Sequence, residues 1–172
     1  MRLLFLILSF FLVGLAQAQQ AETRSILFFG DSITAGLGVD KSQAFPALIQ
    51  QKVDSVGMNY DVINGGLSGE TSAGGLRRID WVLQREIDMM ILELGGNDGL
   101  RGIDLTDTKS NLQQIIDKVE AKYPNAEIIL AGMQVPPNLG QEYTNKFQQI
   151  YPELAEENDL PLIPSIMDKL GG

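Results

Sequence analysis

The chain has 172 residues, of which 44% are hydrophobic and 20% are charged. This balance is typical of one folded domain with its own core, and it excludes an intrinsically disordered chain. The formal net charge of −9 argues against nucleic acid as a partner, because phosphates would be repelled. The sequence holds no cysteine and no histidine, so it has no disulfides and none of the usual metal-binding spacings.

Residues 1–18 have the pattern of a signal peptide. Arg2 supplies a short positive region, Leu3 to Leu15 an apolar stretch, and Ala16-Gln17-Ala18 a small-x-small cleavage pattern. The apolar stretch is short for a membrane span, and no later stretch is long enough, so we expect no stable membrane insertion of the mature chain. We predict cleavage after Ala18 and a periplasmic or secreted protein; an uncleaved N-terminal anchor is the alternative.

The rest of the chain, residues 19–172, alternates strand and helix patterns and shows no linker. Short apolar runs predict strands over residues 26–29, 60–63, 89–94, 128–131 and 160–163. Apolar residues at helical spacing predict helices over residues 45–53, 71–87, 112–123 and 147–155. The alternation predicts one α/β domain with a parallel sheet, helices on both faces and right-handed crossovers.

Capping residues and prolines mark several element ends. Thr106 or Asp107 is expected to cap the third helix, and Pro124 to end it. Pro152 is expected at a break or restart of the last helix. Prolines at both ends of the fifth strand, Pro161 and Pro164, place it near an edge of the sheet.

Small and amide-bearing residues follow the first three predicted strands. These segments are Gly30-Asp31-Ser32, the stretch of residues 64–71, and Gly95-Gly96-Asn97-Asp98. Ligands of open α/β sheets bind beyond the carboxyl ends of the strands, so we expect the three segments to meet there.

These residue types suit acyl transfer to a serine. Ser32 would be the nucleophile, and the N–H groups of Ser32 and Gly69 and the amide of Asn97 would bind the oxyanion. Taken singly, each of these residues is more often a turn or capping residue, and Asp31 is most often a helix cap. A glycosidase built on two carboxylates stays open on spacing alone, but it would leave the Ser, Gly and Asn positions unexplained.

Three blocks of the sequence resemble the GDSL, or SGNH, hydrolase superfamily. Residues 30–36 (GDSITAG) resemble its first block, residues 68–71 (SGET) its second and residues 95–98 (GGND) its third. The longer string LELGGNDGLRG is similar to the branch that contains arylesterases and the thioesterase I enzymes with lysophospholipase activity. The likeness extends from about Ile26 to Ile166.

The resemblance implies a flavodoxin-like, three-layer α/β/α sandwich whose five-stranded parallel sheet has the order 2-1-3-4-5. It implies Ser32 as the nucleophile, with Gly69, Asn97 and the Ser32 N–H as oxyanion donors. It also implies that neither a metal nor an organic cofactor is needed.

The resemblance further implies an Asp-x-x-His segment before a final helix, with the His as general base. Asp168 lies near the end of the sequence, but Gly171 stands where that His would be. We expect that the natural protein continues beyond the given chain, which would lack the triad and the last helix; a short chain that has lost catalysis is the alternative. The chain as given is expected to be nearly inactive, because loss of a triad His typically costs on the order of a million-fold in turnover.

Two loops after the third and fourth strands are candidate walls of an acyl pocket. They offer Leu100, Ile103, Val135 and Leu139, although the same loops also serve simply to cover the sheet. The resemblance implies small-molecule substrates with medium to long acyl chains: aryl esters, acyl thioesters and lysophospholipids. A carbohydrate acetyl-esterase and a non-catalytic binding domain of the same fold are the alternatives, and we expect a monomer.

Overall fold

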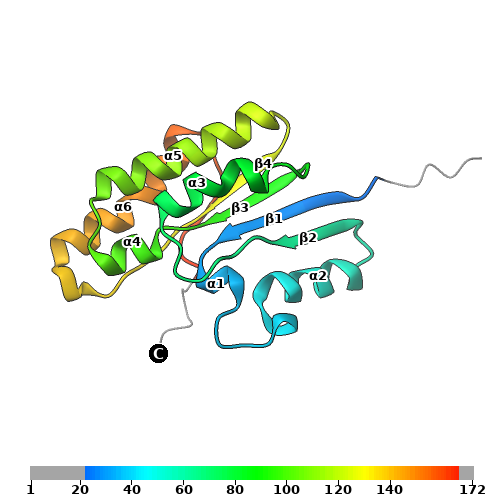
Figure 1. Cartoon of the computed structure of the whole chain (residues 1–172), viewed down its shortest axis with the longest axis horizontal. Coiled ribbons are helices and arrows are strands. Elements are labelled where there is room, and N and C mark those ends of the chain that lie inside the picture. The colour runs from blue at the N-terminus through cyan, green and yellow to red at the C-terminus, as the bar shows by residue number, and fades with distance from the viewer. Residues whose placement is uncertain (1–21, 167–172) are drawn as a thin grey trace, which may run out of the picture.

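A parallel sheet forms the centre of the computed structural model, which describes residues 22–166 (Figure 1). Its strands are β1 (Arg24–Gly30), β2 (Tyr60–Asn64), β3 (Met89–Glu93), β4 (Glu127–Ala131) and β5 (Leu162–Ile163). All neighbouring strands pair in parallel, in the order β2-β1-β3-β4-β5, as predicted. The predicted leader, Asp168 and the expected loss of a last helix fall outside the described residues.

Helices lie on both faces of this sheet, as the alternating pattern predicts. The helices are α1 (Ser32–Ala35), α2 (Phe45–Ser55), α3 (Ser72–Val82), α4 (Gly96–Arg101), α5 (Leu105–Lys122) and α6 (Gln141–Glu157). Short 3₁₀ turns are formed by Lys41–Gln43 and Pro137–Leu139. Figure 1 shows α3, α5 and α6 on one face and α2 on the other.

Successive side chains of the interior strand β1 point to opposite faces and build two apolar clusters. Leu27 and Phe29 pack into the larger cluster, whose helical members come from α3, α5 and α6. Ile26 and Phe28 pack into the smaller cluster, where Phe28 meets Phe45 of α2 edge to face at 5.2 Å between ring centroids. Full burial of such side chains stabilises a fold by about 1.5–3 kcal/mol each.

Only some of the apolar residues of helix α2 pack against the sheet. Val53 is buried and Phe45 packs on the smaller cluster, whereas Leu48 is 49% exposed and Ile49 is 39% exposed. The periodicity therefore identified the helix correctly but overstated how much of it is covered.

Two predicted element ends are wrong, and each has a local cause. The second predicted helix, 71–87, stops at Val82, where the chain turns and the hydroxyl of Tyr123 donates to the carbonyl of Leu83 at 2.7 Å. The N-cap of α5 is Asp104, which accepts from the Thr106 N–H at 2.8 Å, and not Thr106 or Asp107.

Pro152 lies inside a continuous α6 and does not break it. A proline in a helix interior removes one backbone hydrogen bond, at a cost of about 3 kcal/mol. Neighbouring α6 residues Ile150, Tyr151 and Leu154 are all buried in the larger cluster, and this packing outweighs the lost bond.

The short strand β5 pairs with β4 alone, through Leu130↔Leu162 and Ala131↔Ile163. Pro161 precedes it and accepts a backbone hydrogen bond from Leu130 at 2.9 Å, and Pro164 follows it. The predicted edge position is confirmed.

Candidate active site

Ser32 lies on a tight turn at the carboxyl end of the interior strand β1. The strand β1 ends at Gly30, and Asp31 caps α1 by accepting from the Ile33 N–H at 3.0 Å. Ser32 is the first residue of α1, which spans a single turn and ends at Gly36 with a φ of 78°. The turn therefore presents Ser32 at the sheet edge where ligands of this fold class bind.

The second and third loop segments meet this turn through Asn97. Its side-chain amide donates to the Asp31 carboxylate and to the backbone carbonyl of Glu70, both at 3.0 Å. Asp31 precedes Ser32 and Glu70 follows Gly69, so one amide joins all three predicted segments. Both amide hydrogens are occupied, and donation to an oxyanion would replace one of these bonds.

Gly69 occupies a conformation that favours glycine. Its φ is +79°, and the turn is closed by the Glu70 N–H, which donates to the Leu67 carbonyl at 3.1 Å. Arg101 of α4 donates to the Gly69 carbonyl at 3.0 Å. A Cβ at residue 69 would only touch Arg101 at 3.7 Å, so the backbone angle rather than space selects glycine.

A buried ion pair holds the loop before Gly69. The Arg78 guanidinium of α3 donates to the Glu70 carboxylate at 2.6 Å and to the Gly65 carbonyl at 2.7 Å. It also stacks over the Phe29 ring, 4.2 Å from the centroid. These contacts tie the loop to both the sheet and α3.

Glu93 is a fully buried carboxyl beneath the Ser32 turn. One oxygen, Oε2, accepts from the Thr34 N–H at 3.2 Å and from the Thr34 hydroxyl at 2.5 Å, while Oε1 has no hydrogen-bond partner. The side chain fits because residue 30 is glycine: a Cβ there would lie 2.4 Å from Oε2. Burial, together with the nearby Asp31 charge, raises the pKa of Glu93 to about 8.

Asp31 and Asp98 are further buried carboxylates of the site. Burial raises the pKa of Asp31, an effect that hydrogen bonds from Ile33, Asn97 and Ser32 only partly offset. Asp98 accepts from the N–H and the hydroxyl of Ser72, at 2.8 and 2.5 Å, and so ties α4 to the first turn of α3. Sequence reasoning gave no role to Glu93 or Asp98; an acidic residue ending an apolar strand was the available signal for Glu93.

The four predicted wall residues have different surroundings. Leu100 and Leu139 are 54% and 45% exposed, and Ile103 is half-buried. Val135 is 7% exposed and lies in the larger apolar cluster, next to the position that a Cβ on Gly99 would occupy. Val135 therefore packs against α4 from the side of the core. The role of all four residues in substrate binding stays a prediction.

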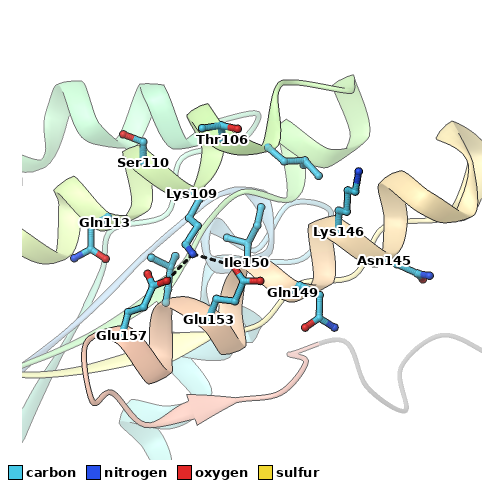
Figure 2. Close-up of a pocket in the computed structure, with 12 residues that line it drawn as sticks. Thr106, Lys109, Ser110, Gln113, Asn145, Lys146, Gln149, Ile150, Glu153 and Glu157 are labelled. Carbon is cyan, nitrogen blue, oxygen red and sulfur yellow. Dashed lines mark hydrogen bonds and ion pairs between the residues drawn. The ribbon is translucent and has the colours of Figure 1, made fainter.

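A cavity of about 620 Å³ lies elsewhere, between α5 and α6 (Figure 2). Lys109 crosses it and pairs with Glu153 and Glu157, both at 2.8 Å. Neither Ser32 nor Asn97 lines this cavity. The convergence of loop segments, rather than cavity size, locates the candidate site.

Residues 22–166 contain neither a candidate metal-binding cluster nor a candidate membrane span. No group of three or more acidic side chains in this range is arranged to hold a metal ion. No helix in the same range is both long and apolar enough to cross a membrane.

Residues 28–170 match the model of the GDSL-like lipase/acylhydrolase family. The chain belongs to this family. The chain is similar to the esterase TesA of Pseudomonas aeruginosa, which is 39% identical over 168 residues, 97% of this chain and 83% of that protein. Thioesterase 1/protease 1/lysophospholipase L1 of Escherichia coli K12 is 39% identical over 164 residues, 95% of this chain and 76% of that protein.

A solved structure of the family has the same fold. The crystal structure of AlinE4, an SGNH-hydrolase family esterase, superposes with a TM-score of 0.82 at 42% identity, covering 87% of this chain and 80% of that one. The predicted α/β fold and strand order are thereby confirmed. The family membership makes the protein a carboxylic ester hydrolase of the SGNH type.

Proposed function

We propose that Ser32 is the nucleophile and that ester hydrolysis passes through an acyl-serine intermediate. The observation that carries the proposal is the position of the Asn97 amide, which bridges the residue before Ser32 and the residue after Gly69. Acyl transfer needs a serine on an exposed turn with fixed donors beside it, and these three segments supply both.

In the proposed mechanism, the Ser32 oxygen attacks the carbonyl carbon of the ester and transfers its proton to a base. The N–H groups of Ser32 and Gly69 and the Asn97 amide stabilise the resulting oxyanion. Collapse of the tetrahedral intermediate expels the alcohol or thiol, and water then hydrolyses the acyl-serine. Losing one such donor typically slows the reaction by about 100- to 1,000-fold.

The expected rate of ester hydrolysis depends on the base that accepts the Ser32 proton. The given sequence contains no histidine, and a serine hydroxyl without an adjacent base is a weak nucleophile. We therefore expect slow turnover of activated esters by the chain as given.

We further propose that the substrates are acyl esters and thioesters with medium to long chains, including aryl esters and lysophospholipids. The names of the relatives, which include a thioesterase and lysophospholipase, support this class. Exposed Leu100 and Leu139 offer apolar contact for an acyl chain. Apolar pockets discriminate by only about 1–3 kcal/mol per methylene, so a broad preference is expected. The signal-peptide pattern of residues 1–18 supports export to the periplasm or medium.

A fluorophosphonate probe tests the nucleophile directly. Mass spectrometry after long incubation should place one phosphonyl group on Ser32, and Ser32→Ala should abolish labelling. The control is Ser42→Ala, an exposed serine outside the site, which should label like the unchanged protein. Labelling that survives Ser32→Ala would overturn the assignment of Ser32 as the nucleophile.

A series of p-nitrophenyl esters from acetate to decanoate tests the substrate class. The proposal expects a shallow preference for the longer chains. A sharp preference for acetate would favour the carbohydrate acetyl-esterase.

A further inference from the structure

Large aliphatic side chains are exposed on the loops that surround Ser32. These loops follow β1, β2, β3 and β4 at the carboxyl edge of the sheet, and Figure 1 shows α1 and α4 together at the end toward which β1 points. The exposed fractions run from 45% to 73% for Leu37, Val39, Leu67, Leu100 and Leu139. Exposed apolar residues that gather at one place often mark an interaction surface.

Backbone contacts place two of these residues beside the nucleophile. The Leu37 N–H donates to the Ser32 carbonyl, and the Leu67 N–H donates to the Gly30 carbonyl, both at 3.0 Å. Leu37 and Leu67 thus come from the loops on either side of the Ser32 turn.

The other loops are joined to the same group. Arg101, next to Leu100, donates to the Gly69 carbonyl two residues after Leu67. A methyl group of Leu139 lies 3.3 Å from the position of a Cβ on Gly102, so the loop after β4 touches the end of α4. These contacts join the segments that carry the five exposed residues around Ser32, and we call the five residues the carboxyl-edge patch.

The charges near the patch indicate the charge of the partner surface that it can bind. Residues 36–44 carry one acid and one base, Asp40 and Lys41, and residues 132–140 carry no charged residue. Glu70 is paired with Arg78, and the exposed positive charge of Arg101 is balanced by the exposed negative charge of Asp104. The rim is thus close to neutral, while the net charge of −9 on the whole chain repels anionic surfaces. A neutral or zwitterionic surface is the partner that these charges favour.

We propose that the carboxyl-edge patch docks the protein reversibly on a zwitterionic lipid surface and places Ser32 at the lipid–water boundary. Aliphatic side chains on loops gain free energy by entering the headgroup region without spanning the bilayer. Leu100 and Leu139, the predicted acyl walls, belong to the patch, so a lipid acyl chain would pass from the surface to Ser32 along apolar contacts. This inference rests on the proposed function, since it states how the ester substrate is presented.

Flotation with phosphatidylcholine vesicles tests the docking without any catalysis. Residues 19–172, which contain the whole described domain, are used because the apolar leader would bind vesicles by itself. The test variant is Leu37→Ser/Leu67→Ser. The control is Val56→Ser/Met58→Ser, because these side chains are 54% and 52% exposed at the opposite edge of the sheet. Circular dichroism verifies that each variant is folded.

The unchanged protein should float with the vesicles, the test variant should bind at least tenfold more weakly, and the control should bind normally. Failure of the unchanged protein to bind, or equal weakening in both variants, would overturn the proposal. Binding to phosphatidylglycerol vesicles alone would overturn the assignment to a zwitterionic surface. A dimer that the test variant abolishes would assign the patch to a second copy of the chain. Phosphonate labelling of Ser32 in solution reports the proposed function separately from each of these results.

Discussion

Replacing Glu93 by glutamine should change how the stability of the fold depends on pH. The pKa of Glu93 rises from its ordinary value of 4.5 to about 8 on folding. Below pH 4.5 the carboxyl is protonated in both the folded and the unfolded state, so its titration does not change the free energy of unfolding. As the pH rises from 4.5 to 8, the unfolded chain ionises while the folded protein keeps the proton, so the free energy of unfolding falls by about 1.4 kcal/mol per pH unit. The accumulated loss reaches about 5 kcal/mol near pH 8 and levels off above it.

Glu93→Gln removes this titration while leaving an acceptor for the Thr34 N–H and hydroxyl. Urea unfolding at pH 5, 6, 7 and 8 should show the variant gaining stability relative to the unchanged protein by about 1.4 kcal/mol per pH unit. Glu127→Gln, at the exposed start of β4, is the matched control and should run parallel to the unchanged protein. Parallel pH profiles for Glu93→Gln and the unchanged protein would refute the reasoning, because Glu93 would then ionise as it does in water.

Three substitutions test other parts of the site. Asn97→Ala should slow phosphonylation of Ser32 by about 100-fold or more, measured as a labelling rate, because an oxyanion donor is lost; an unchanged rate would contradict its role. Gly69→Ala should cost about 1–2 kcal/mol in urea unfolding, since alanine is strained at a φ of +79°. Asp98→Ala should cost about 2–4 kcal/mol, because it leaves the buried Ser72 N–H and hydroxyl without their acceptor; a loss below 1 kcal/mol would mean that water replaces the carboxylate.

The α/β class and the meeting of the three loop segments were predictable from the residue pattern, whereas the strand order followed from the family resemblance. Apolar runs separated by helical stretches predict a parallel sheet, and the carboxyl ends of its strands share one edge. Ser32, Gly69 and Asn97 each follow a strand closely, so errors in helix length do not move them relative to that edge.

The features that sequence reasoning missed depend on contacts between distant segments. Each of Asp104, Thr106 and Asp107 is a residue type that can cap a helix. Only the backbone conformation decides that Asp104 is the N-cap of α5. Pro152 reads as a helix break until the burial of its neighbours is known. The burial of Glu93 cannot be predicted from its place in the strand, because it depends on the space beside Gly30, 63 positions earlier in the sequence.

The slot beside Gly30 also constrains how this family can diverge. Gly30 leaves the space, Glu93 fills it and Thr34 supplies the donors, so no one of the three positions can change freely while the others stay fixed. A Cβ at position 30 would also meet the Thr34 hydroxyl and the backbone carbonyl of Glu93, so a shorter residue at position 93 would not by itself make room for one. Position 30 should therefore stay glycine in folded proteins, and a laboratory library that randomises positions 34 and 93 together should yield folded proteins that single-site libraries miss.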